Sequence, residues 1–136
     1  MKQLTFRLKP GQHLKEEIEK ISHEKSVKAG VLLSIVGGLE NAVLRMAGSE
    51  PENQIMKEWK GPFEIISGTG TISQDGCHIH ISLSDQRGNV IGGHLRDGCV
   101  VKYTAEIVFG VFEDVIYKRR LDKNTGFSEL EIEKDA

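Results

Sequence analysis

Residues 76–95 read GCHIHISLSDQRGNVIGGHL. The residues that follow Gly76 alternate in polarity, with His78, His80, Ser82 and Ser84 on one side and Cys77, Ile79, Ile81 and Leu83 on the other. Alternation with a period of two is typical of a β-strand with one face against a core. A glycine-containing loop at 85–89 then leads into a second strand-like run at 90–96, so the pattern predicts a β-hairpin.

The same patterns extend outward from this hairpin along the whole chain. Leu14, Ile18 and Ile21 have helical spacing and predict one helix over residues 12–26. Asp97-Gly98 predicts a two-residue hairpin turn, and the acidic tail from Asn124 onward is expected to fray at its end. Further strands are predicted at 2–8, 29–36, 42–47, 55–60, 63–73, 100–111 and 115–118, with Gly37-Gly38 interrupting the chain after residue 36.

This order of elements predicts an α+β fold, with a largely antiparallel sheet and one main N-terminal helix packed on it. The chain of 136 residues forms a single domain, residues 1–136. Several of the predicted strands are apolar on both faces, and edge strands need cover. We therefore expect a homo-oligomer.

Composition limits the partners of this chain. Charged residues make up 28% and hydrophobic residues 38%, and the formal net charge is −2, as in ordinary soluble globular proteins. The basic residues at 118–123 are flanked by acidic ones, which disfavours direct DNA binding, because DNA binders need a basic excess. No apolar run follows Met1 and none is long enough to cross a bilayer, so we expect a cytoplasmic protein without membrane contact.

Three histidines form the main candidate site. His78 and His80 lie on one strand face, and the rise per residue of a strand places them about 7 Å apart. A third imidazole, from His94 on the next strand, would give the three-nitrogen set of an open zinc site. The alternative is that the three rings are polar groups of a subunit interface or of a solvated sheet face.

The register of the hairpin decides between these two interpretations. His94 shares a face with the other two histidines if paired residue numbers sum to an even value, and lies on the opposite face if the sum is odd. A turn at Asp97-Gly98 would pair His94 with Val101, whereas a bulge at Gly92-Gly93 would change the register.

Several other side chains that could take part in chemistry or binding can also be explained by a purely structural role. Cys77 points away from the histidines and is interpreted as a core residue, and a disulfide with Cys99 stays open. Glu64 and Glu106 are candidate acid–base groups or partnered structural carboxylates. Phe63, close to Trp59, either packs in the core or forms an interaction surface.

Three motifs carry a resemblance to a known family. They are Gly61-Pro62-Phe63-Glu64-Ile65-Ile66, His78-Ile79-His80-Ile81-Ser82 and Gly92-Gly93-His94-Leu95. Together they resemble the PPC domain, the plant and prokaryote conserved domain, over essentially all 136 residues. The family hexapeptide reads Gly-Arg-Phe-Glu-Ile-Leu, so Pro62 and Ile66 depart from it.

The resemblance implies a homotrimer, a protein-recruiting surface at Gly61–Ile66 and a metal, with zinc expected, on His78, His80 and His94. Prokaryotic members are often described as DNA-binding, but in the plant proteins the AT-hook contacts DNA, and this chain has no Arg-Gly-Arg-Pro core. The leading hypothesis is a stand-alone module that binds a metal or small ligand and a macromolecular partner. The alternative is a metal-dependent, lyase-like enzyme for a small oxo or hydroxy acid, because the fold is also similar to a domain of α-acetolactate decarboxylase.

Overall fold

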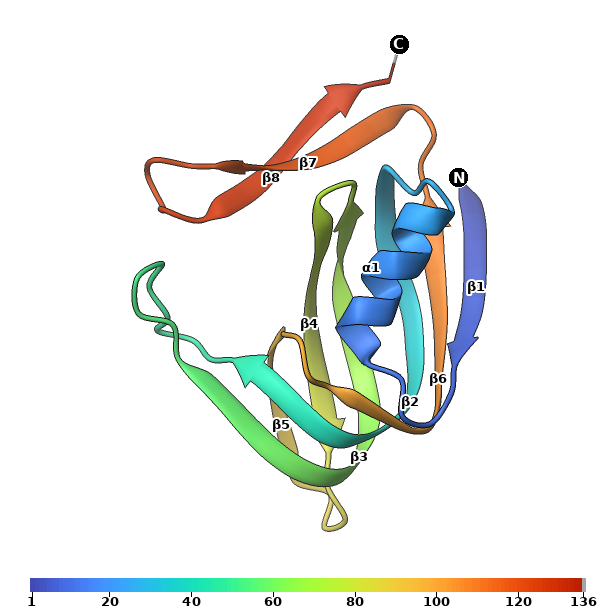
Figure 1. The fold of residues 1–136 in the computed structure, drawn as a ribbon, viewed down its shortest axis with the longest axis vertical. Coiled ribbons are helices and arrows are strands. Elements are labelled where there is room, and N and C mark those ends of the chain that lie inside the picture. Colours follow the sequence, from blue (N-terminus) through green and yellow to red (C-terminus); the bar gives the residue numbers. More distant parts are fainter. Residues whose placement is uncertain (136) are drawn as a thin grey trace.

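Eight strands and one helix make up residues 1–135, which are the residues that the computed structural model describes (Figure 1). Every strand pairing is antiparallel, which confirms the predicted α+β class. No helix in this part of the chain has the length and apolar character needed to span a bilayer. In chain order the elements are β1 (Lys2–Leu8), α1 (Leu14–Glu24), β2 (Ala29–Arg45), β3 (Met56–Ser73), β4 (Gly76–Ser84), β5 (Val90–Leu95), β6 (Val100–Val111), β7 (Val115–Leu121) and β8 (Ser128–Lys134).

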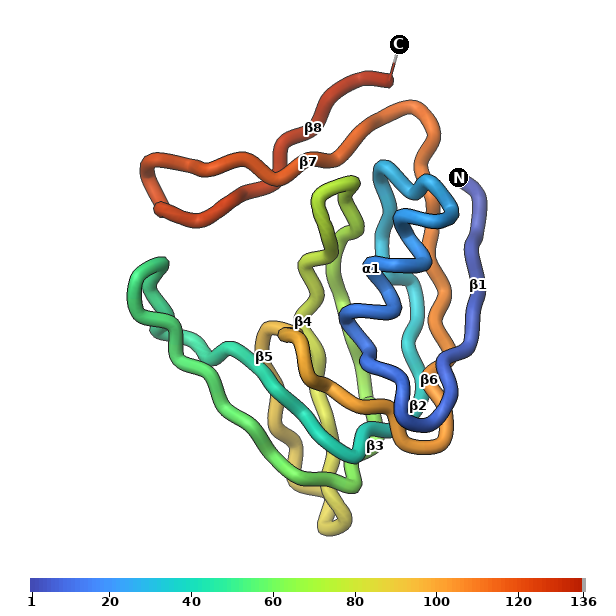
Figure 2. Tube along the Cα trace, in the orientation of Figure 1, coloured from blue at the N-terminus to red at the C-terminus, as the bar shows by residue number. Residues whose placement is uncertain are grey.

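The main sheet has the order β1-β6-β2-β3-β4-β5, and the end of β2 also pairs with β5. The four strands β2, β3, β4 and β5 therefore close into a ring. The closure depends on the length of β2 and β3, which have 17 and 18 residues. Both strands bend away from the helix (Figure 2), and β2 carries register shifts that allow such bending.

The length of these two strands corrects the sequence prediction. Residues 29–36 and 42–47 were expected as two strands interrupted by Gly37-Gly38, but β2 runs through both glycines. A Cβ on Gly37 would lie 2.1 Å from the carbonyl oxygen of Thr104, so glycine lets β6 approach closely rather than ending the strand. Likewise, the strands predicted at 55–60 and 63–73 are one strand, β3.

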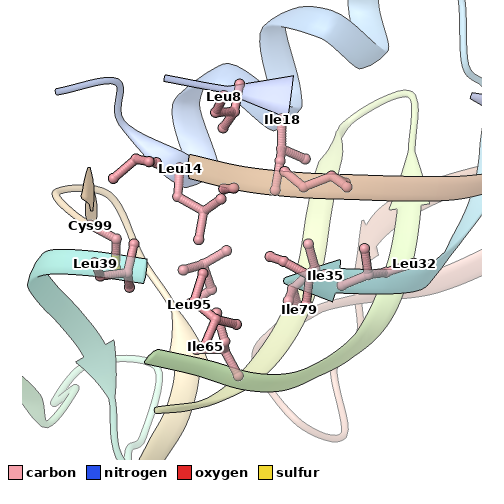
Figure 3. Close-up of a cluster of buried hydrophobic side chains, with 14 of the residues drawn as sticks. Leu8, Leu14, Ile18, Leu32, Ile35, Leu39, Ile65, Ile79, Leu95 and Cys99 are labelled. Atoms are coloured by element: carbon pink, nitrogen blue, oxygen red, sulfur yellow. The ribbon is translucent and has the colours of Figure 1, made fainter. Parts of the chain in front are cut away.

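The core lies between α1 and the sheet (Figure 3). The helix begins at Leu14 and buries Leu14 and Ile18 completely, as the predicted helical spacing requires. Side chains from β1 to β5 meet these helix residues from the inner face of the sheet, and they include Leu8, Leu32, Ile35, Leu39, Ile65, Ile79 and Leu95.

The turn at Asp97-Gly98 does not form the predicted hairpin. β5 pairs with β4 and with β2, and β6 pairs with β1 and β2, so β5 and β6 are not neighbours. The segment instead carries the chain past β2, where the Asn41 side-chain amide donates to the carbonyl of Gly98 at 2.9 Å. As a result, His94 does not pair with Val101.

The C-terminal segment forms a separate two-stranded sheet, β7–β8, of which the sequence analysis predicted only residues 115–118. It lies across the end of the molecule where β3 turns into β4 (Figure 1). Backbone hydrogen bonds anchor it, because Tyr117 N–H donates to the carbonyl of Lys28 and Gln74 N–H donates to the carbonyl of Tyr117. The acidic composition of this segment led to the prediction of a tail that frays at its end. However, its acidic residues alternate with Leu130 and Ile132, which is the pattern of a strand.

Candidate metal centre

The three histidines share one face of the sheet. On β4, Ile79 and Ile81 are buried in the core, while His78 and His80 point to the opposite side. In the hairpin His80 pairs with His94, so the register has the even sum that places His94 on the same face. The Gly92-Gly93 bulge is not formed, because the register runs through both glycines without a shift.

The imidazoles are close enough to share one ion. The ring centroid of His78 lies 5.1 Å from that of His80 and 4.7 Å from that of His94, and the last two are 5.5 Å apart. One nitrogen from each ring lies within 4.8 Å of the others. Since zinc–nitrogen bonds are about 2.0–2.1 Å long, small side-chain rotations would bring three nitrogens onto one ion. A His₃ set suits zinc and leaves a coordination position open.

Burial and nearby cations lower the pKa of two of these rings, His78 and His94. Burial, followed by the charge of Arg45 and by the other two histidines, lowers the pKa of His94 to about 3. Burial and then the charge of Arg119 lower the pKa of His78. Only an unprotonated imidazole can bind a metal, so His78 and His94 carry the protonation state that a ligand needs at neutral pH.

One arginine contacts the cluster directly. Arg45 Nη2 lies 3.0 Å from Nδ1 of His94, which is its pairing partner on the neighbouring strand. A guanidinium can only donate, so Nδ1 of His94 accepts, and the neutral ring carries its proton on Nε2. The guanidinium of Arg45 also lies over the ring of Phe127, 5.0 Å from its centroid, and this contact connects the cluster to the β7–β8 hairpin.

The histidines line a cavity of about 790 Å³ between the main sheet and the β7–β8 hairpin. Arg45 and Arg96 line it from the main body, and Arg119, Phe127 and Glu129 line it from the hairpin. None of these five residues was predicted to be part of the metal site. One signal was available, because alternation along β7 places Arg119 on the face opposite to its two basic neighbours.

Glu64 and Glu106, the two carboxylates predicted as possible acid–base groups, do not lie in this cavity. Both are exposed and neither lines it. Of the acidic residues that do line it, Glu19 accepts hydrogen bonds from Lys15 and from the backbone of Cys77, and Asp75 accepts one from the backbone of Arg119. Glu19 and Asp75 thus hold the surrounding structure together.

The segment Gly61–Ile66 lies apart from the histidines, in the middle of β3. Phe63 and Ile65 are buried, which confirms the core interpretation for Phe63, while Pro62, Glu64 and Ile66 are exposed. Pro62 and Glu64 line a second groove, of about 280 Å³.

Both cysteines are free thiols in the structure. Cys99 is wholly buried, and burial raises its pKa to about 11. Because the thiolate is the reactive form, we expect iodoacetamide at pH 8.5 to modify Cys99 at least about 100-fold more slowly in the folded protein than in urea. Rapid labelling of Cys99 in the folded protein, detected by peptide mass spectrometry, would contradict its burial.

The raised pKa also predicts how stability depends on pH. The folded state keeps the Cys99 thiol proton above pH 9, where the unfolded chain loses it, so stability should fall as the pH rises from 9 toward 11.

Comparison with known proteins places this geometry in context. Residues 1–113 match the family model of the Plants and Prokaryotes Conserved (PCC) domain. Two Synechococcus proteins named bifunctional protein GlmU are 41% identical over 96% of this chain and 38% identical over all of it. The matches cover 20% and 21% of those proteins, so the chain spans about a fifth of the length of the curated relatives it matches.

Several solved structures share the whole fold. A hypothetical protein from Salmonella enterica is 30% identical with a TM-score of 0.92, and the match covers 99% of this chain and 95% of that one. A metal-containing protein from Archaeoglobus fulgidus is also 30% identical, with a TM-score of 0.81 over 95% of this chain and 92% of its own. A plant- and prokaryote-conserved protein from Pyrococcus horikoshii is 26% identical, with a TM-score of 0.85 over 96% and 92% of the two chains.

More distant structures show similarity of fold alone. Acetolactate decarboxylase from Bacillus subtilis is 17% identical with a TM-score of 0.53, over 77% of this chain and 51% of that one. A protein from Bacteroides thetaiotaomicron whose name suggests DNA binding is 18% identical with a TM-score of 0.84, over 95% and 91% of the two chains.

Proposed function

The chain belongs to the Plants and Prokaryotes Conserved (PCC) domain family, and on this premise we propose that it is a metal-binding interaction module. His78, His80 and His94 would hold one divalent transition metal, for which zinc is our first candidate. Residues 61–66 would serve as a recognition or assembly segment.

The observation that carries the metal proposal is the convergence of three imidazole nitrogens within 4.8 Å on one sheet face. The name of the Archaeoglobus relative, a metal-containing protein, agrees with this proposal. A zinc ion bound there would supply a Lewis acid with an open position. The chain's own residues would orient the rings and limit access of water, with Phe127 and Arg119 covering the cavity from the hairpin.

Zinc content tests this proposal. After loading and dialysis at neutral pH, we expect about one zinc ion per chain in the wild-type protein and near none in His80→Ala.

The lyase-like alternative rests on a shared fold with acetolactate decarboxylase at 17% identity, so binding rather than turnover is the function we propose.

We also propose that the chain assembles as a homotrimer through the outer face of β2, β3 and β6. Four apolar side chains are exposed there, namely Leu33, Val36, Ile66 and Tyr103, each at least half accessible to solvent. A cluster of this kind on a single chain is typical of an interface between subunits. Val36 and Tyr103 line the same groove as Pro62, so the exposed half of the hexapeptide would lie next to this contact.

Analytical ultracentrifugation tests the assembly. We expect wild-type protein to sediment with three times the 15.1 kDa mass of one chain, and Ile66→Glu to sediment as a monomer, because the substitution would place a charge in an apolar interface. Ile132→Glu is the matched control, since Ile132 is similarly exposed but lies on β8. A monomeric wild-type protein, or a trimeric Ile66→Glu variant, would contradict this proposal.

A further inference from the structure

Three arginines around the histidine cavity have no acidic partner. Arg45, Arg96 and Arg119 line the cavity, and among residues 1–135 none of them forms a salt bridge. By contrast, Lys118 and Arg120, which flank Arg119 on β7, pair with Glu133 and Glu131 at 3.1 Å. The hairpin therefore pairs its outward cations with carboxylates, whereas the inward Arg119 has no carboxylate partner and donates from Nη2 to Oγ1 of Thr71 at 2.9 Å.

The positive charge in this cavity exceeds the negative charge. Besides the three arginines the lining holds Lys15, and its carboxylates are Glu19, Asp75 and Glu129. Lys15 and Glu19 pair with each other at 3.0 Å, and Asp75 is bonded to the backbone of Arg119. Asp75 and Glu129 are thus the two carboxylates left to oppose three guanidinium groups, and a divalent metal ion would add two more positive charges.

Metal binding would break the hydrogen bond between Arg45 and His94 and leave the Arg45 guanidinium without its acceptor. If a metal bonds to Nδ1 of His94, it takes the lone pair that now accepts from Arg45. If the metal bonds to Nε2 instead, the ring proton moves to Nδ1, which then can no longer accept. In either case Arg45 loses its acceptor, and a half-buried guanidinium without an acceptor is costly.

From these observations we propose that the metal site binds a small oxyanion ligand, in which a carboxylate or phosphate group pairs with Arg45 and Arg119. This inference rests on the proposed metal-binding function and names the ligand class of the same site. The planar guanidinium fork matches both kinds of oxyanion in a bidentate manner. Phe127, stacked on Arg45, restrains the guanidinium close to the metal ligands.

Anion titrations of the loaded protein test this inference. Isothermal calorimetry of the zinc-loaded protein would use pyruvate and inorganic phosphate as the two oxyanion probes, with pyruvamide as the uncharged control. Cobalt(II) in place of zinc gives a second readout, since an anion that reaches the metal shifts its visible absorption bands. We expect one oxyanion to bind per chain, a band shift for that anion, and no binding of pyruvamide.

Two arginine variants and one control assign the contacts. Arg45→Gln and Arg119→Gln should each weaken oxyanion binding at least about 10-fold, as expected for the loss of a charge-assisted pair. Arg120→Gln should leave binding unchanged, because Arg120 faces away from the cavity and pairs with Glu131. If Arg119→Gln does not fold, Arg45→Lys, which keeps the charge and loses the fork, replaces it as the second variant.

The outcomes separate the two proposals. A protein that loads one metal ion but binds neither pyruvate nor phosphate would overturn the oxyanion inference and leave the metal-binding function intact. Arginine variants that bind as tightly as Arg120→Gln would also overturn it. A protein that loads no metal would overturn the proposed function itself. Binding of pyruvate alone or phosphate alone would support the inference and identify the oxyanion.

Discussion

Replacing His80 with alanine is expected to reduce the zinc content of the loaded protein from about one ion per chain to near none. His80 is one of three imidazoles that converge within 4.8 Å, and its removal leaves two. Losing even an outer-shell partner of a metal ligand costs about 10–100-fold in affinity, so losing a ligand should cost at least about 100-fold. Elemental analysis after dialysis, supported by competition with a chelator, measures the effect.

His23→Ala is the matched control for this substitution. His23 is exposed in the last turn of α1 and is not a member of the histidine cluster, so its removal should not change the zinc content. Because the side chain of His80 is exposed, His80→Ala should also keep nearly the wild-type unfolding midpoint in the absence of metal. Equal zinc content in His80→Ala and wild-type protein would show that the metal binds elsewhere.

The second large effect concerns the core. Phe109→Ala is expected to lower the free energy of unfolding by about 3–5 kcal/mol. Phe109 is completely buried on β6, and its ring meets that of Phe6 edge to face at a centroid distance of 5.2 Å. It pairs with Leu4 on β1 and Leu32 on β2, so the cavity left behind would lie where three strands meet.

Urea unfolding followed by circular dichroism measures this loss. Ile132→Ala is the control, because Ile132 is 62% exposed on β8, and a surface substitution of this kind should stay within about 0.5 kcal/mol. A loss below about 1 kcal/mol for Phe109→Ala would mean that the strands around it do not form the core described above.

Local patterns in the sequence predicted much of this fold. Alternation identified the strands of the β4–β5 hairpin, and helical spacing identified α1, because both signals depend on residues a few positions apart. The face that carries His78 and His80 followed from the same alternation. The position of His94 could only be stated as a condition, since it depends on the register between two strands.

The failures share a physical cause, which is that the pairing partner of a segment, and not its composition alone, decides its structure. Asp97-Gly98 has the composition of a hairpin turn, yet β2 pairs with both flanking strands and keeps them apart. The acidic residues of β8 suggested a loose tail, but Glu131 and Glu133 pair with basic residues of β7. Because β8 was missed, the hairpin cover of the histidine site was missed with it, including Arg119 and Phe127.

The hairpin has a consequence for how such proteins diverge. The family match ends at residue 113, before β7 begins at Val115, whereas His78, His80 and His94 all lie within the matched part. One wall of the cavity therefore lies outside the residues that match the family model. If the site binds an oxyanion as proposed, changes in residues 115–134 would alter its ligand selectivity while the histidines stay the same.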